Sequence, residues 1–263
     1  MKKLFFIIAA AAAICACGPK LVILHTNDTH SHMDPLRDGT GGIVERAAFV
    51  DSVRKAEGAD KVLLLHAGDF NQGTSYYTQL HGSLETDMVN AMKYDAVALG
   101  NHEFDNGIED LTERVRRLEC PVVCANLDLS SFELGKYVQP YTILHRGGMK
   151  IGIIGLEADI SSCVAKTISS RIPQLDPVEV TNKWSDYLHN EEKCDMVILL
   201  SHYGYKPEDM ETMPKLRGID LVIGGHSHDF VDDFVYVEDS EQKPVPIITD
   251  GCWGLEMGMI KVY

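Results

Sequence analysis

The sequence predicts an α/β fold, because short buried strands alternate along it with amphipathic helices. Several apolar runs are rich in Val, Ile and Leu, and runs of this length suit strands that are buried on both faces. These runs are Leu21–His25, Val62–His66, Ala96–Leu99, Val122–Ala125, Met196–Leu200, Leu221–Ile223 and Val245–Ile248. Their alternation with helical segments implies that helices cover the sheets.

Helical patterns lie between these runs. The residues that recur at helical spacing are Ile43, Ala47, Val50 and Val53, and then Ile108, Leu111, Val115 and Leu118. Residues 141–144 and 150–156 flank an Arg-Gly-Gly turn at 146–148 and predict a β-hairpin. The segment 258–263 predicts a last strand, and we expect a single domain from Leu21 to Tyr263.

The composition is that of an ordinary globular protein with an excess of negative charge. The chain has 263 residues, of which 45% are hydrophobic and 24% are charged, and its formal net charge is -15. A protein this acidic does not bind nucleic acid through a basic surface, so we expect no nucleic-acid partner. If the protein handles phosphate, it must reverse its own field locally, and bound metal ions are the usual means.

The first residues predict an export signal and not a part of the fold. Lys2 and Lys3 precede an apolar run at 4–14, which is too short to span a bilayer but suits a signal peptide. The run ends in Ile14-Cys15-Ala16-Cys17, which resembles the lipobox of bacterial lipoproteins. The alternative is a plain secretory signal that is cleaved nearby.

The lipobox resemblance implies where the mature protein is found. We expect a signal peptide at 1–16, lipidation of Cys17 and a linker at 17–20. Several acyl chains on one residue give stable anchoring where a single chain does not. The protein is therefore expected outside the cytoplasm, anchored by lipid to a bacterial membrane and facing the periplasm.

Polar side chains follow five of the predicted strands at the point where each strand ends. The segments are His25–His30, Gly68–Asn71, Gly100–Asp105, Ser201–Gly204 and Gly224–His228. Ligand sites of open α/β sheets lie at the carboxyl ends of the strands, so we expect these segments to meet at one edge. A single His at a strand end is more often structural, but five such segments together indicate a site. Oxygen and imidazole ligands without thiolates suit Zn²⁺ or Mn²⁺.

The same segments carry five motifs in a specific order. They are Asp28-x-His30, Gly68-Asp69, Gly100-Asn101-His102-Glu103, His202 and Gly225-His226-x-His228. This set resembles the calcineurin-like metallophosphoesterases, and Leu24–Asp28 and Asn101–Asp105 look like the catalytic domain of the bacterial 5′-nucleotidase/UDP-sugar hydrolase branch. The resemblance implies the metallo-dependent phosphatase fold, which is a four-layer α/β/β/α sandwich that holds two divalent metal ions (Zn²⁺, Mn²⁺ or similar).

The resemblance also assigns the ligands of the two ions. One ion would be held by Asp28, His30, Asp69 and His228. The other would be held by Asp69, Asn101, His202 and His226, so that Asp69 bridges the pair. The nucleotidase branch often has Gln where this chain has His228, and this difference implies a shift in metal preference.

Two further residues are the expected catalytic pair. By resemblance, His102 faces the phosphoryl group without binding metal, and Asp105 holds its imidazole in the cationic form. Asn101 and His102 would also contact the substrate. The alternative for His102 and Asp105 is an ion pair that only stiffens a loop.

The expected substrate is a phosphorylated small molecule, a nucleotide above all. The nucleotidase branch usually carries a C-terminal domain that grips the base, and the sequence up to Tyr263 shows no such segment. A separate protein with that domain would then be a partner. The alternatives are a phosphodiesterase, a cyclic-nucleotide or pyrophosphate hydrolase, and a lipoprotein subunit that binds metal or nucleotide without catalysis.

Overall fold

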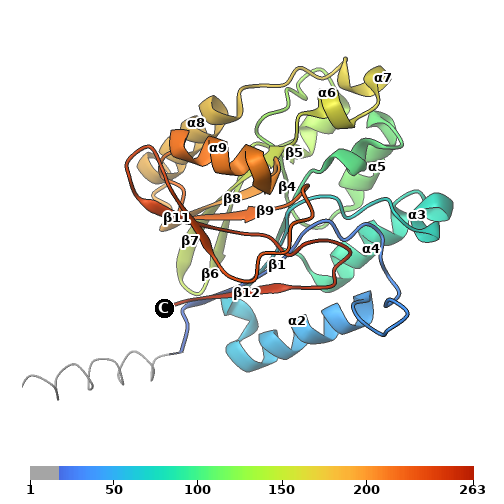
Figure 1. Ribbon diagram of the computed structural model, residues 1–263, viewed down its shortest axis with the longest axis horizontal. Helices are drawn as coiled ribbons and strands as arrows, with labels where there is room; N and C mark the ends of the chain where they lie inside the picture. The colour runs from blue at the N-terminus through green and yellow to red at the C-terminus, as the bar shows by residue number, and fades with distance from the viewer. Residues whose placement is uncertain (1–17) are drawn as a thin grey trace, which may run out of the picture.

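The computed structural model describes residues 18–263, so the predicted signal peptide and Cys17 lie outside the described residues. In this part of the chain, no helix has both the length and the apolar character needed to cross a bilayer. The strands form two six-stranded sheets that pack face to face (Figure 1). This is an α/β fold, as the sequence predicts.

The first sheet has the order β12-β1-β2-β3-β4-β5. Its strands are β1 (Leu21–Thr26), β2 (Val62–His66), β3 (Ala96–Ala98), β4 (Val122–Val123), β5 (Val138–Gln139) and β12 (Gly258–Val262). Strands β1 to β5 are parallel to their neighbours, and β12 is antiparallel to β1. The carboxyl ends of β1, β2 and β3 therefore lie at the same edge.

The second sheet has the order β10-β11-β9-β8-β7-β6. Its strands are β6 (Tyr141–Arg146), β7 (Met149–Glu157), β8 (Met196–His202), β9 (Leu221–Gly224), β10 (Val235–Glu238) and β11 (Pro244–Ile248). Strands β7, β8, β9 and β11 are parallel, while β6 and β10 pair antiparallel at the two ends. Both sheets are mixed for this reason.

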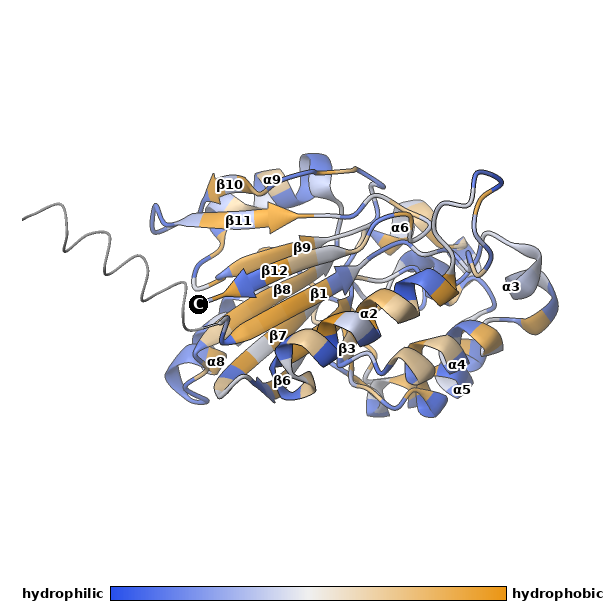
Figure 2. Cartoon of the chain, turned by 90° about the horizontal axis from the view of Figure 1, so that it is seen from below, coloured by the Kyte–Doolittle hydropathy of each residue, from blue (hydrophilic) through white to orange (hydrophobic). Residues whose placement is uncertain are grey.

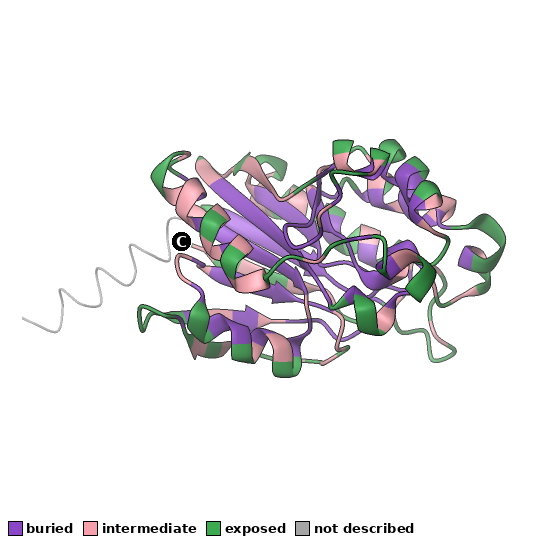
Figure 3. Cartoon of the chain, turned by 90° about the horizontal axis from the view of Figure 1, so that it is seen from above, coloured by how far each residue is buried: buried purple, intermediate pink, exposed green. Residues whose placement is uncertain are grey.

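Helices cover the outer faces of the two sheets. They are α2 (Ile43–Glu57), α3 (Ser75–Leu80), α4 (Ser83–Met92), α5 (Ile108–Arg117), α6 (Ile160–Cys163), α7 (Lys166–Ser169), α8 (Pro177–Asn190) and α9 (Met210–Thr212). The outer turns of the helices are exposed while the strands are buried (Figure 3). The strands in the middle of the molecule are correspondingly apolar (Figure 2).

Strand β1 shows how the layers are held together. Leu21 and Ile23 pack in the core between the two sheets, whereas Val22 and Leu24 pack in the core under α2, α4 and α5. Side chains alternate between the two faces of a strand, so one apolar run supplies both cores. Each such side chain contributes about 1.5–3 kcal/mol through its burial. A third core joins the second sheet to α8, and the predicted four-layer sandwich is therefore confirmed.

The predicted strands and helices are found at or near their expected positions, but some elements were not predicted. Helix α8 begins after Asp176, whose carboxylate accepts hydrogen bonds from the N–H groups of Val178 and Glu179. Pro177 stands at its first position, where a missing N–H costs nothing. The unpredicted elements include α4, α8, β5 and β10. Strand β10 is only half-buried, so it lacks the apolar run that marks the other strands.

Candidate metal centre

The motifs at the strand ends converge at one edge of the sandwich. Asp28 and His30 follow β1, Asp69 follows β2, and His202 is the last residue of β8. Three groups of side chains bring their ligand atoms within 4.8 Å of one another in the described part of the chain. The groups are Asp28, His30 and His228; His30, Asp69 and His102; and Asp69, His202 and His226. Asp69 and His30 each belong to two groups, so the three are one continuous cluster.

The first group is arranged around the Nε2 atom of His30. This atom lies 2.9 Å from Nε2 of His228 and 3.9 Å from Oδ2 of Asp69, while Nε2 of His228 lies 3.3 Å from Oδ1 of Asp28. The other ring nitrogen of His30 lies 3.3 Å from the carbonyl oxygen of Asn71. Donation from Nδ1 to that carbonyl selects the tautomer whose Nε2 lone pair points into the cluster.

The group of Asp69, His202 and His226 is arranged around His202, which is fully buried. Its Nδ1 atom lies 2.6 Å from the carbonyl oxygen of Ala67, and its Nε2 atom lies 3.1 Å from Oδ2 of Asp69. Among residues 18–263, Nε2 nevertheless has no partner in hydrogen-bonding geometry. Nearby, Nδ1 of His226 lies 2.8 Å from Oδ1 of Asn101. A buried lone pair without a donor, next to a carboxylate and an amide oxygen, is the environment that a divalent cation requires.

The electrostatics around His202 favour positive charge. Burial alone would lower the pKa of His202, but the carboxylates of Asp69 and Asp28 outweigh it and raise that pKa well above its ordinary value. Burial alone would likewise raise the pKa of Asp69, yet His202 and His30 hold it below its ordinary value. The negative potential that favours a proton on His202 favours a metal cation in the same place.

The backbone is strained at this edge of the sheets. The residues with positive φ include Asp28 (46°), His30 (45°), Asp69 (56°), His226 (70°) and His228 (57°). A non-glycine residue in this left-handed region costs on the order of 1–3 kcal/mol and persists only where the surroundings enforce it. Strain that gathers on five of the seven predicted ligands points to a functional site.

His102 and Asp105 lie on the solvent side of the cluster. Nδ1 of His102 is 2.9 Å from Oδ2 of Asp105, and the two side chains are 31% and 34% exposed. The hydrogen bond to Asp105 raises the pKa of His102 to about 9, so the imidazole is cationic at neutral pH. The ring of His102 also lies 5.3 Å from that of His30, which groups it with potential ligands as well as with Asp105.

Asn27 orients Asp28 and was missed by sequence reasoning. Its Nδ2 donates to Oδ2 of Asp28 at 2.7 Å, while its Oδ1 accepts the N–H of Asp250 at 2.8 Å. The N–H of His226 donates to the same Asp28 oxygen at 2.9 Å. With Oδ2 occupied in this way, Oδ1 is the oxygen that faces the histidines.

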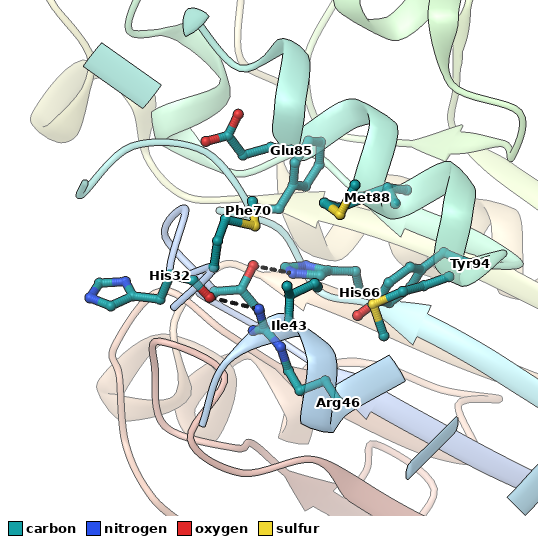
Figure 4. A pocket seen from close by; sticks show the side chains of 12 residues that line it. His32, Ile43, Arg46, His66, Phe70, Glu85, Met88 and Tyr94 are labelled. Carbon is teal, nitrogen blue, oxygen red and sulfur yellow. Dashed lines mark hydrogen bonds between the residues drawn. The ribbon is translucent and has the colours of Figure 1, made fainter. Parts of the chain in front are cut away.

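Three other histidines near the motifs have structural partners. His25 pairs with Asp250 at 2.6 Å, and Nε2 of His66 lies 3.0 Å from the hydroxyl of Thr29. Burial lowers the pKa of His66 to about 3, so it stays neutral. His66 lines a cavity of about 20 Å³. Figure 4 shows its lining, in which Arg46 donates to the carbonyl of His32. No predicted ligand lines this cavity among residues 18–263.

Comparisons with known proteins agree with this geometry. A family model described as calcineurin-like phosphoesterase matches residues 21–230. The chain is 30% identical to human 5′-nucleotidase over 281 residues, which cover 92% of this chain and 46% of that protein. It is also 30% identical to the snake venom 5′-nucleotidase of Naja atra over 272 residues, covering 92% of this chain and 50% of that protein. The chain thus spans about half the length of these curated relatives.

Solved structures show the same likeness. A 5′-nucleotidase precursor from Thermus thermophilus matches with a TM-score of 0.83 and 32% identity, covering 91% of this chain and 50% of that one. The NAD nucleotidase of Haemophilus influenzae matches with a TM-score of 0.80 and 29% identity, covering 91% and 52%. The chain belongs to the calcineurin-like phosphoesterase family and is related to the catalytic domain of the 5′-nucleotidases.

Proposed function

We propose that this chain is a dinuclear metal-dependent phosphomonoesterase of the 5′-nucleotidase type. The observation that supports it best is the buried Nε2 atom of His202, which faces Asp69 in a cluster of further imidazole and carboxylate groups. This atom lacks a hydrogen-bond partner in the part of the chain that the structure describes. The donor set of carboxylate, amide and imidazole groups fits Zn²⁺ or Mn²⁺. When bound, two such cations neutralise charge on a phosphoryl group and activate water for in-line displacement.

The proposal assigns each predicted ligand to one of two ions. Asp28, His30 and His228 hold the first ion, and Asn101, His202 and His226 hold the second. Asp69 lies between them, since its Oδ2 is 3.1 Å from Nε2 of His202 and 3.9 Å from Nε2 of His30. The carboxylates and the neutral imidazoles supply the charge and lone pairs, and the loops supply the fixed geometry.

His102 carries the proton chemistry in this proposal. Its Nδ1 atom is bonded to Asp105. The Nε2–H group of the His102 imidazolium is therefore left to donate to a phosphoryl oxygen. Because the pKa of His102 is raised to about 9, the proton is present at neutral pH and is available to the leaving oxygen. The amide N–H group of Asn101 is the second expected contact to the substrate.

We further propose that the substrate is a nucleotide and that the protein acts outside the cytoplasm. Relatives named 5′-nucleotidase support a nucleotide substrate. We also propose, from the resemblance to the nucleotidase branch alone, that a separate protein of the C-terminal-domain type supplies base recognition. Export and lipidation at Cys17 are proposed from the lipobox resemblance alone. With them, the reaction would take place outside the cytoplasm.

Phosphate release from 5′-AMP tests the proposal. A protein without residues 1–17 would be loaded with Mn²⁺ or Zn²⁺ and assayed alongside p-nitrophenyl phosphate and its bis-ester. Rapid AMP hydrolysis is the expected result for a self-sufficient nucleotidase. Turnover of p-nitrophenyl phosphate alone would assign base recognition to a partner, and turnover of the bis-ester alone would favour a phosphodiesterase. A metal-replete protein that hydrolyses none of them contradicts the enzymatic proposal and favours a binding protein.

A further inference from the structure

Glu103 is a fully buried carboxylate directly behind the candidate metal centre. It accepts five hydrogen bonds from N–H groups. Its Oε2 atom accepts from the backbone of Gly100 at 2.6 Å and of Asp69 at 2.9 Å. Its Oε1 atom accepts from the backbone of Phe70 at 3.1 Å, and from the backbone and side chain of Asn71 at 3.2 and 3.0 Å. Neither oxygen is left to contact a substrate, so Glu103 acts only through other residues.

These bonds join two loops that come from different strands. Gly100 precedes Asn101 and His102 at the end of β3, whereas Asp69, Phe70 and Asn71 follow β2. The join is reciprocal, because Oδ1 of Asp69 accepts the backbone N–H of His102 at 2.9 Å. That bond uses one oxygen of Asp69 and leaves the other, Oδ2, facing His202.

The loop held by Glu103 in turn holds His30. The carbonyl of Asp69 accepts the backbone N–H of His30 at 3.0 Å, and the carbonyl of Asn71 lies 3.3 Å from its Nδ1 atom. The first of these bonds places the His30 backbone, and the second selects its tautomer. The N–H groups of residues 69–71 bind Glu103 while their carbonyls bind the loop after β1, so one carboxylate organises three strand ends.

Asp69 also needs this support because of its own conformation. Its φ angle is 56°, in the left-handed region that non-glycine residues rarely adopt. Gly100 approaches it so closely that a Cβ atom there would lie 2.4 Å from the Asp69 nitrogen. The Glu103 carboxyl group lies between the N–H groups of Asp69 and Gly100 and holds this close approach by accepting a hydrogen bond from each.

We propose that Glu103 is a positioning residue that locks the loops after β2 and β3 together and so sets the affinity of the site for divalent metal and the rate of the reaction. The inference rests on the proposed function for the rate and on the candidate metal centre for the affinity. A group that positions ligands affects metal binding even when the protein stays folded, whereas a group that only stabilises the fold does not.

The test is the Glu103→Gln variant of the protein that comprises residues 18–263, with Mn²⁺ as the probe. Glutamine keeps the shape, but its NH₂ group must face at least two of the five N–H donors. We expect the dissociation constant for Mn²⁺ to rise at least tenfold and kcat on p-nitrophenyl phosphate to fall at least tenfold, with a smaller change in KM. Far-UV circular dichroism and a thermal melt report whether the variant folds.

Glu85→Gln is the matched control. Glu85 is equally buried and accepts a hydrogen bond from the hydroxyl of Ser31, but it does not bridge the two loops. We expect it to lower the melting temperature and to leave the Mn²⁺ affinity within about twofold of wild type. If Glu103→Gln behaves in the same way, losing stability but not Mn²⁺ affinity or kcat, the positioning role is wrong.

A milder variant covers the case in which Glu103→Gln does not fold. Asn71→Ala removes only the side-chain donor and keeps the four backbone bonds. A several-fold loss of Mn²⁺ affinity is expected, and wild-type affinity would overturn the proposal.

A wild-type protein that binds Mn²⁺ but hydrolyses no ester contradicts the proposed function, while the Mn²⁺ titrations still decide the role of Glu103. A wild-type protein that binds neither Mn²⁺ nor Zn²⁺ overturns both.

Discussion

Asp105 holds the imidazole of His102, while Asp69 holds the backbone of the same residue. Its Nδ1 atom lies 2.9 Å from Oδ2 of Asp105, and its backbone N–H donates to Oδ1 of Asp69 at 2.9 Å. The first contact sets the charge of the ring, and the second ties its backbone to the metal cluster. His102 is thus placed relative to the cluster without using the ring atom that would face a substrate.

We predict that His102→Ala lowers turnover and leaves metal binding intact. General acid catalysis of this kind contributes about 10²–10⁴-fold to the rate. The measurement is kcat on p-nitrophenyl phosphate together with the metal content of the same sample by mass spectrometry. His145→Ala, which changes an exposed histidine on β6, is the control. Loss of metal in step with activity would show that His102 is a ligand, as its closeness to His30 and Asp69 permits.

Chelation is predicted to destabilise the protein. Asp28 and Asp69 are both buried in the same cluster. Burying two carboxylates is costly, and a bound cation offsets that cost. A ligand at 100 times its dissociation constant stabilises the folded state by about 2.7 kcal/mol, so EDTA should lower the melting temperature by several degrees. In His202→Ala the drop on chelation should be smaller, because one ion has lost a ligand. Equal melting temperatures with and without EDTA in the wild type contradict a tight metal centre.

Sequence patterns predicted most of the strands and the edge of the sheets at which the motif segments meet. Runs such as Val62–His66 supply side chains to two hydrophobic cores at once. A strand buried on both faces must be apolar at every position, so its place in the sequence is easy to identify. The parallel order then brings Asp69 and His202 to one edge although they are 133 residues apart in the chain. Elements with a weaker demand were missed, since β10 is only half-buried.

The groups that support the site could not be predicted in the same way. Asn27 bonds to Gly251 and Asp250, which are more than 220 residues away, and no local pattern marks such a contact. Glu103 stands in a motif between His102 and Phe104, yet its five N–H partners are defined only by the folded loops. Ligand types follow from residue chemistry, whereas their orientation depends on tertiary hydrogen bonds.

A single added methyl group at Gly100 is predicted to disrupt the site. A Cβ atom there would lie 2.3 Å from Oδ1 of Asp69 and 2.4 Å from its backbone nitrogen, so the loop after β2 must move. Overpacking of this kind costs about 1–3 kcal/mol. Gly100→Ala should therefore lower both kcat and Mn²⁺ affinity at least tenfold. Gly224→Ala is the control, because its nearest neighbour would be 3.5 Å away, and wild-type behaviour of both variants would argue against a tight loop contact.

Asp209 is predicted to make the metal-free protein less stable as the pH rises. Burial raises the pKa of this carboxyl from 3.8 to about 7, and within residues 18–263 only Ser201 donates to it. The folded state therefore holds the proton that the unfolded state releases. The free energy of unfolding therefore falls between about pH 4 and pH 7 and stays low above that range. At 1.36 kcal/mol per pKa unit, the loss is about 4 kcal/mol at most.

Asp209→Asn removes the ionisation, so in EDTA it should melt several degrees above wild type at pH 8 and close to it at pH 4. Asp51→Asn, on the exposed side of α2, should follow the wild type at both pH values. Parallel pH profiles of wild type and Asp209→Asn would mean that Asp209 is already ionised in the folded protein, with a cation or water supplying what Ser201 alone does not.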